Sequence, residues 1–260
     1  MKLRIGLIQM RCEKAALAEN LAVTSYYLAE AVEKGVDIVC FPEMSISGYA
    51  DPTRYPEAVI QLDGPEVAHI LDMTEGIPAT VLAGLIEENP EGKPFITQIV
   101  VRNGQLLGYY RKITIKDEEE DWFSPGEAVP VFTHKDTIFG IAICADICNE
   151  GVFSECARKG AQIVFESAAP GLHGEQETRN WQTGFEWWKN KCKKHLDQYT
   201  KKYNMWAVVA TQAGRTADED FPGGGYVFAP DGCRVCATSD WSPGALYVEI
   251  NLENRHVLPL

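Results

Sequence analysis

Short apolar runs alternate along the chain with longer segments in which apolar residues recur at helical spacing. The runs at residues 3–9, 38–41, 79–86, 95–101, 138–144, 163–165 and 206–210 predict strands. Helical spacing predicts helices over residues 17–35, 65–74, 150–159 and 179–203. Strands that alternate with helices indicate an α/β fold, and no repeat or low-complexity linker divides the sequence. We therefore expect a single domain spanning residues 1–260.

Turn residues between apolar runs predict antiparallel connections in two places. Asn103-Gly104 separates the run at 95–101 from a predicted return strand at 106–115. Near the end of the chain, Pro230-Asp231-Gly232 separates a strand at 226–229 from one at 234–237, and a further strand is expected at 246–250.

The amino-acid composition argues against some classes of binding partner. The 260 residues include 24 Lys and Arg against 37 Asp and Glu, which gives a net charge of −13. This acidic balance argues against nucleic acid or an anionic membrane as a partner. No apolar run approaches the ~20 residues that a membrane span needs. The eight cysteines are too sparse for a disulfide scaffold, so we expect reduced thiols in the cytoplasm.

Three reactive side chains lie at the ends of predicted strands, where active sites of α/β proteins gather. Glu43 follows the apolar run 38–41 and could act as a base. Lys112 lies within the predicted strand 106–115, where it could be a fixed positive charge. Cys144 ends the strand 138–144 just before a helix, a placement that exposes a thiol near backbone N–H groups. A helix N-terminus and a nearby lysine would lower the pKa of this thiol.

Each of these residues, taken alone, also fits an ordinary structural role. Glu43 could be a solvated carboxylate after a strand-ending proline, and Lys112 could extend to solvent at a sheet edge. Cys144 could be a buried, inert thiol. The segments become specific only in combination and in their order along the chain.

That combination resembles the nitrilase superfamily of carbon–nitrogen hydrolases. It consists of Phe41-Pro42-Glu43, then Tyr110-Arg111-Lys112, then a strand ending in Cys144-Ala145-Asp146. Three further segments also resemble the family, namely Ile5-Gly6-Leu7-Ile8-Gln9, Phe123-Ser124-Pro125-Gly126 and residues 225–232. The resemblance therefore covers nearly the whole chain.

The resemblance implies a four-layer α-β-β-α sandwich and a Glu-Lys-Cys catalytic centre without metal or cofactor. In it Cys144 would be the nucleophile, Glu43 the general base and Lys112 the stabiliser of the tetrahedral intermediate. Many members carry a second Glu four residues before the Phe of the Phe-x-Pro-Gly turn. That position is Glu119, and the neighbours Glu118 and Glu120 stay open as alternatives. The resemblance also implies a homo-oligomer, commonly a dimer.

The residues after the nucleophile bear on the substrate. Cys144-Ala145-Asp146 resembles the amidase and carbamoylase branches, whereas nitrilases of the family usually carry Cys-Trp-Glu. We expect hydrolysis of a small aliphatic or carbamoyl-type amide to an acid and ammonia or an amine through a thioester. The alternatives are a nitrile hydrolase and a catalytically silent member that binds partners through its Trp-rich segment.

The chain departs from the family pattern in two places. Residues 147–150 lack the Arg with which some members recognise a substrate carboxylate, although Arg179, Arg215 or a loop could supply a basic group. The stretch 179–203 is rich in Trp and Lys, and we interpret it as an amphipathic surface helix with a pocket wall or subunit contact as the alternative. Cys148 and the pair Cys233-x-x-Cys236 are interpreted as structural, because no second cysteine pair stands at zinc-binding spacing.

Overall fold

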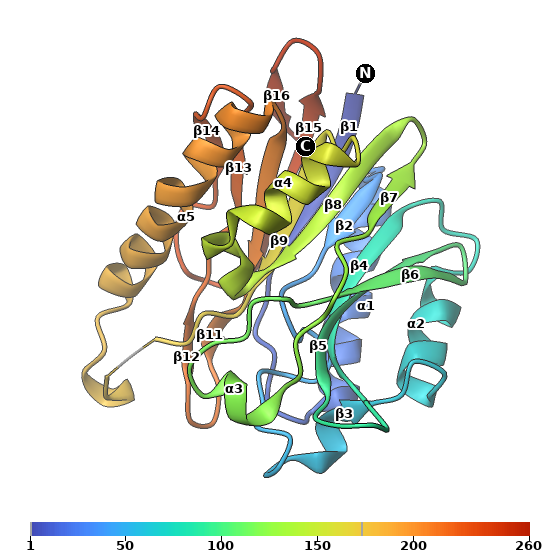
Figure 1. Ribbon diagram of the computed structural model, residues 1–260, viewed down its shortest axis with the longest axis vertical. Coiled ribbons are helices and arrows are strands. Elements are labelled where there is room, and N and C mark those ends of the chain that lie inside the picture. The colour runs from blue at the N-terminus through green and yellow to red at the C-terminus, as the bar shows by residue number, and fades with distance from the viewer. Residues whose placement is uncertain (1, 173) are drawn as a thin grey trace.

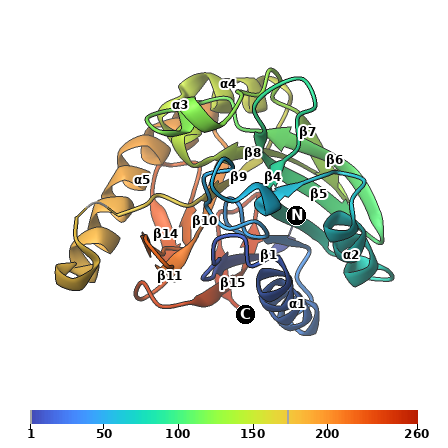
Figure 2. The same cartoon turned by 90° about the horizontal axis from the view of Figure 1, so that it is seen from below.

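Two β-sheets packed face to face form the centre of the molecule, and helices cover the outer face of each sheet (Figures 1 and 2). The structure is a computed structural model and describes residues 2–172 and 174–260. The four layers confirm the predicted α-β-β-α sandwich. The one-domain organisation of residues 1–260 stays a prediction.

The first sheet contains both the first and the last strand of the chain. Its strands, in spatial order, are β16 (Val257–Pro259), β15 (Gly244–Asn251), β1 (Lys2–Gln9), β2 (Ile38–Cys40), β4 (Thr80–Glu87), β5 (Phe95–Arg102) and β6 (Gln105–Arg111), with β3 (Val59–Ile60) beside part of β4. Helices α1 (Leu17–Glu33) and α2 (Pro65–Thr74) cover its outer face (Figure 2). Leu28 of α1 and Val67 of α2 belong to the same buried cluster as Val39 and Val81 of the sheet.

The second sheet contains β14 (Arg234–Ala237), β13 (Tyr226–Phe228), β10 (Trp206–Thr211), β9 (Ile163–Ala168), β8 (Thr137–Ile143) and β7 (Val131–His134) in that order. Helices α4 (Glu150–Arg158) and α5 (Trp181–Tyr203) pack on its outer face (Figure 1). Gly140 of β8 allows α4 to approach closely, because a Cβ there would clash with the side chain of Cys156. Residues with even numbers on β8 therefore face the helices, and the alternating odd ones face the other sheet.

The inner faces of the two sheets form the main core. Leu82 of the first sheet and Phe165 of the second are both fully buried in it. A polar bridge also crosses this layer, because the Ser167 hydroxyl donates to the side-chain oxygen of Gln98 at 3.1 Å. The Gln98 amide in turn donates to the carbonyl of Phe41, just after β2, at 3.1 Å. The bridge fixes the position of one sheet against the other beside the loop that carries Glu43.

The structure corrects two predicted boundaries. The strand expected over 106–115 ends at Arg111, because the carbonyl of Lys112 accepts from Gly126 of a loop instead of continuing the ladder. The helix expected over 179–203 begins at Trp181, where the side chain of Asn180 accepts from the Thr183 N–H at 3.1 Å and caps it.

Several short elements complete the fold. They are the turns of 3₁₀ helix η1 (Pro56–Ala58), η2 (Cys144–Cys148) and η3 (Gln176–Thr178), the short helix α3 (Glu119–Trp122), and the strand pair β11 (Ala213–Arg215) and β12 (Asp220–Pro222). Of these, η2 and α3 carry residues of the candidate site.

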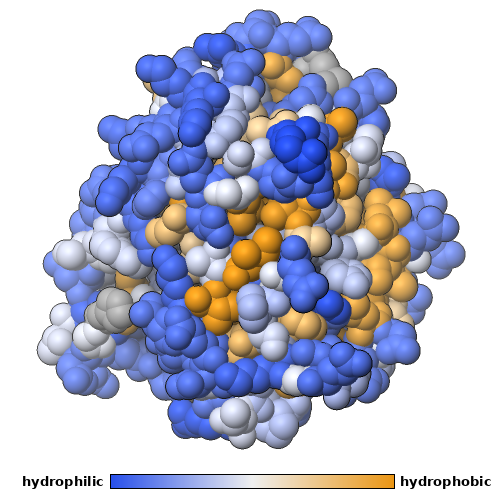
Figure 3. All heavy atoms as spheres, viewed as in Figure 1, coloured by the Kyte–Doolittle hydropathy of each residue, from blue (hydrophilic) through white to orange (hydrophobic). Residues whose placement is uncertain are grey.

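The surface of the molecule is mostly polar on the side shown in Figure 3, as expected for helices and strands that bury only one face. Figure 3 shows a largely hydrophilic surface on the face seen in Figure 1, with hydrophobic side chains showing at its centre and right. Within the described residues, no helix combines the length and apolar character that crossing a membrane requires.

Candidate active site

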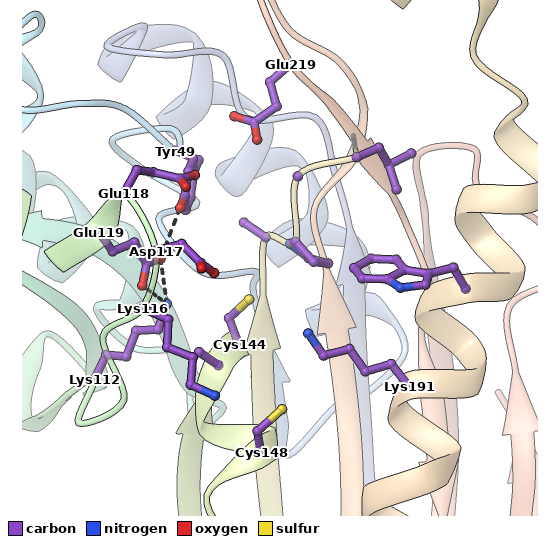
Figure 4. A pocket seen from close by; sticks show the side chains of 16 residues that line it. Tyr49, Lys112, Lys116, Asp117, Glu118, Glu119, Cys144, Cys148, Lys191 and Glu219 are labelled. Atoms are coloured by element: carbon purple, nitrogen blue, oxygen red, sulfur yellow. Dashed lines mark hydrogen bonds and ion pairs between the residues drawn. The ribbon is translucent and has the colours of Figure 1, made fainter. Parts of the chain in front are cut away.

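Side chains that follow β6 and β8, together with one from α3, line a cavity of about 470 Å³ (Figure 4). Lys112, Glu119 and Cys144 line this cavity. Glu43 lies behind Lys112 and is fully buried. The structure thus brings together all four residues that the sequence indicated.

Glu43 is placed by a tight loop that follows β2. Met44 has a φ of +49°, and the loop passes so close to β4 that only glycine fits at position 84. A Cβ on Gly84 would clash with the backbone of Pro42 and Met44. One carboxylate oxygen of Glu43 accepts from Lys112 Nζ at 2.8 Å, and the other accepts from the Ala169 N–H at 2.9 Å.

Lys112 lies between two carboxylates just past the end of β6. Its backbone N–H donates to Ile96 at 2.8 Å, and its carbonyl accepts from Gly126 at 2.7 Å. Its ammonium donates to Glu43 at 2.8 Å and to both oxygens of Glu119 at 2.7 and 2.8 Å. Burial opposes the charged form, but Glu43 and Glu119 outweigh it and raise the pKa of Lys112 well above its usual value. Lys112 is therefore a fixed cation.

Glu119 differs from the acidic residues beside it. It is 5% exposed, whereas Glu118 and Glu120 are both exposed side chains. Its Oε1 also accepts from the Tyr49 hydroxyl at 3.1 Å. Burial raises the pKa of Glu119 to about 7, although Lys112 acts in the opposite direction. One acid of the stretch 117–121 is thus turned inward, and it is the one at the position that the Phe-x-Pro-Gly turn indicated.

Cys144 sits at a sharp turn between β8 and η2. Its φ of +45° lies in the left-handed region, which a non-glycine residue adopts only when its surroundings hold it there. The side chain of Asp146 stabilises this turn through hydrogen bonds. Its carboxylate accepts from the Tyr110 hydroxyl at 2.7 Å, the Thr114 N–H at 2.8 Å and the Ile143 N–H at 3.0 Å.

The expectation of a lowered thiol pKa is wrong. Burial and then the negative charge of Glu43 raise the pKa of Cys144 well above its usual value, and Lys112 offsets them only in part. The thiol is therefore protonated before substrate binds. A thiol in this state needs a base to become a nucleophile.

The sequence did not single out two residues that shape the site or its surroundings, Tyr49 and Asp220. Tyr49 is six residues after Glu43 in the same loop, and nothing in the pattern marks its hydroxyl as a partner of Glu119. Trp187 of α5 lines the cavity, so the pocket wall that was the alternative interpretation of the stretch 179–203 is found at this residue. Asp220 is fully buried and binds Arg179 and Arg215 at 3.1 Å each, so neither arginine is free to serve the cavity.

Comparisons with known proteins agree with this geometry. The model of the carbon–nitrogen hydrolase family matches residues 4–258. A formamidase of Bradyrhizobium sp. (strain ORS 278) is 32% identical over 176 residues, which cover 63% of this chain and 51% of the relative. The chain thus spans about half the length of the formamidases that it matches. A probable nitrilase of Schizosaccharomyces pombe is 23% identical over 99% of this chain and 92% of its own.

The fold also matches a solved structure. An amidase of the nitrilase superfamily from Nesterenkonia AN1 superposes with a TM-score of 0.80 at 21% identity, over 95% of this chain and 90% of the amidase. Since the family model matches all but a few terminal residues, the chain belongs to the carbon–nitrogen hydrolase family.

Proposed function

We propose that the protein hydrolyses small aliphatic or carbamoyl-type amides to an acid and ammonia or an amine, with Cys144 as nucleophile. One observation supports this assignment most strongly. A buried ammonium, Lys112, is held between the carboxylates of Glu43 and Glu119 in the wall of the cavity that also exposes Cys144.

The proposed reaction begins with the attack of Cys144 on the amide carbonyl. Glu43 takes the thiol proton as the sulfur–carbon bond forms, because the raised pKa of the thiol leaves no thiolate to react unaided. The Lys112 ammonium and the backbone N–H of Ala145 stabilise the developing oxyanion, and both residues line the cavity. Such donors contribute roughly 3–4 kcal/mol each in other enzymes.

The intermediate then collapses to a thioester. The carbon–nitrogen bond breaks, and the leaving nitrogen takes the proton from Glu43 and departs as ammonia or an amine. Glu43 next removes a proton from water, which attacks the thioester carbonyl. The carbon–sulfur bond breaks, the acid is released and Cys144 regains its proton.

Similar proteins support an amide substrate rather than a nitrile. Relatives with about 32% identity to this chain are formamidases. One structure of the Nesterenkonia AN1 amidase shows covalent addition of the acetamide moiety of fluoroacetamide at its active-site cysteine, and another is a complex with butyramide. Cys144-Ala145-Asp146 lacks the Trp-Glu pair that nitrilases usually carry after the cysteine.

The test is release of ammonia from a panel of short amides, carbamoyl compounds and the matching nitriles. We expect turnover of amides, little turnover of nitriles, and no turnover by Cys144→Ala. Cys148→Ala is the matched control, because this thiol also lines the cavity but lies one turn farther along η2. Activity that survives in Cys144→Ala would refute the nucleophile role. Preference for nitriles would favour a nitrilase, and an inert panel with an unreactive Cys144 would favour a binding protein.

We further propose that the protein is cytoplasmic and forms a homodimer. All eight cysteines are free, as expected in a reducing compartment. The dimer rests on the family resemblance alone. Cell fractionation and sedimentation velocity test these two proposals.

A further inference from the structure

We infer that the substrate of the proposed amidase carries a carboxylate at the end remote from the scissile amide, and that Lys116 and Lys191 bind it. The inference rests on the proposed function and specifies its substrate class. It depends on the distribution of charge in the cavity that holds Cys144.

Two lysines from distant parts of the chain line this cavity together with Cys144. Lys116 belongs to the loop between β6 and α3, and Lys191 lies in the middle of α5. In Figure 4 their side chains extend from opposite sides toward the space between Cys144 and Cys148. Two ammonium groups thus line the cavity on the Cys148 side of the nucleophile.

Neither ammonium is paired with an acidic side chain in the part of the chain that the structure describes. Among residues 2–172 and 174–260, no ion pair involves Lys116 or Lys191, whereas Lys112 is bonded to two carboxylates. The Lys191 ammonium lies over the rings of Trp187 and Trp188, at 5.3 and 5.8 Å from their centroids. Aromatic faces hold a cation in place without neutralising it. This end of the cavity therefore presents positive charge to a ligand.

Burial and the same positive charges lower the pKa of a neighbouring histidine, His195. Nε2 of His195 lies 3.9 Å from the sulfur of Cys148 at this end of the cavity. Burial, followed by the charges of Lys194, Lys191 and Lys116, lowers the pKa of His195. Both cavity lysines thus act on one point, together with Lys194 of the same helix.

Three further carboxylates line the cavity, those of Asp117, Glu118 and Glu219. In Figure 4 they lie on the Tyr49 side of Cys144, opposite the lysines. Glu219 is also 3.4 Å from the ammonium of Lys14. The cavity is therefore polarised, with its acidic groups at one end and its unpaired cations at the other.

This polarity fixes how a substrate would lie. The carbonyl carbon must reach Cys144, and an anionic tail is favoured only toward Lys116 and Lys191. The two arginines that could have filled this role are bound to Asp220 instead. The class that fits is a short monoamide of a dicarboxylic acid or a carbamoyl compound with a carboxylate.

The experiment compares three amides of equal chain length, which end in a carboxylate, a methyl group or an ammonium group. We expect kcat/KM to fall in that order, with the anionic amide favoured over the neutral one by about 10- to 100-fold, the range for hydrogen bonds to charged groups. Lys191→Gln and Lys116→Gln should each reduce this ratio, and the double variant should bring it close to one. High salt should reduce it in the wild type.

Lys201→Gln is the matched control, because Lys201 is exposed in the last turn of the same helix, does not line the cavity and is not among the lysines that lower the pKa of His195. It removes the same charge, so the ratio should stay at the wild-type value. Equal rates for the anionic and neutral amides, or a preference for the ammonium amide, would overturn the inference and leave the proposed function standing. Failure to hydrolyse any of the three would overturn both.

Discussion

The site depends on one cation, Lys112, whose side chain is almost fully buried. Its ammonium compensates for two buried carboxylates, Glu43 and Glu119, that would otherwise repel each other. The same cation faces the cavity in which an oxyanion would form. One residue therefore serves both the stability of the resting site and the proposed chemistry.

Replacement of single acids in the stretch 117–121 tests which carboxylate supports Lys112. Glu119→Gln should lower kcat by at least ~10-fold, because it removes a charge-assisted contact to Lys112. Glu118→Gln and Glu120→Gln alter exposed side chains and should change kcat little. Steady-state kinetics of the three variants measures the ranking, and a larger loss in Glu118→Gln or Glu120→Gln would contradict our assignment.

The raised pKa of Glu119 predicts how stability changes with pH. Its value rises from an ordinary 4.5 to about 7 on folding, so between these pH values the native state binds more protons than the unfolded state. This residue therefore makes the free energy of unfolding fall as pH rises from 4.5 to 7, by at most about 3 kcal/mol. Glu119→Gln should lack this component.

Urea unfolding of the wild type and Glu119→Gln across this pH range measures the difference. The wild type should lose stability relative to the variant as pH rises. A difference that is constant with pH, or that changes with the opposite sign, would show that Glu119 does not titrate as described.

At the scale of elements, the fold positions the site through close approaches rather than through long regular structure. The loop with Glu43 crosses β4 at Gly84, and the loop at Gly126 packs against the end of β6 beside Lys112. At both positions a Cβ would clash with backbone atoms, which cannot move aside as a flexible side chain can.

Gly84→Ala tests this dependence. The added methyl group should displace the loop of Pro42 to Met44, lower activity by at least ~10-fold and reduce stability by roughly 1–3 kcal/mol. Gly244→Ala is the control, because a Cβ there meets nothing nearer than 4.0 Å. Activity assays and thermal unfolding compare the two variants, and a Gly84→Ala variant indistinguishable from Gly244→Ala would refute the role of the close approach.

The sequence predicts helices and strands well where they have a long apolar pattern. It predicts them poorly where an element is short or where tertiary contacts determine its position. The buried runs of β4, β8 and β10 and the periodicity of α1 are confirmed. Strands such as β7, β12 and β16, of three or four residues, are too short to show a period.

The position of Glu119 follows from a motif, but its contact with Tyr49 depends on a loop path that no local pattern encodes. The raised pKa of Cys144 likewise depends on burial and on Glu43, which only the folded chain brings near.

At the scale of the whole molecule, the two sheets share one core, and the site lies where their loops meet. Glu43 comes from the first sheet and accepts a hydrogen bond from Ala169, just past β9 of the second. Neither sheet could keep this geometry without the other. The bond between Ser167 and Gln98 supports the same contact.

This shared core predicts that the chain unfolds as one cooperative unit. Tryptophan fluorescence reports mainly on the second sheet and its helix α5, through the buried Trp188 and Trp206, while far-UV circular dichroism reports on both layers. The two signals should change at the same urea concentration. Transitions with separate midpoints would indicate two independent domains.

The central claim is that Cys144 becomes acylated during turnover, and intact mass spectrometry after rapid acid quench tests it most directly. The wild type mixed with an amide that it hydrolyses should gain the mass of the acyl group, on the peptide that contains Cys144. Cys144→Ala should gain none and should not turn over the amide. Hydrolysis that continues in Cys144→Ala, or an acyl group found on a different residue, would contradict the account.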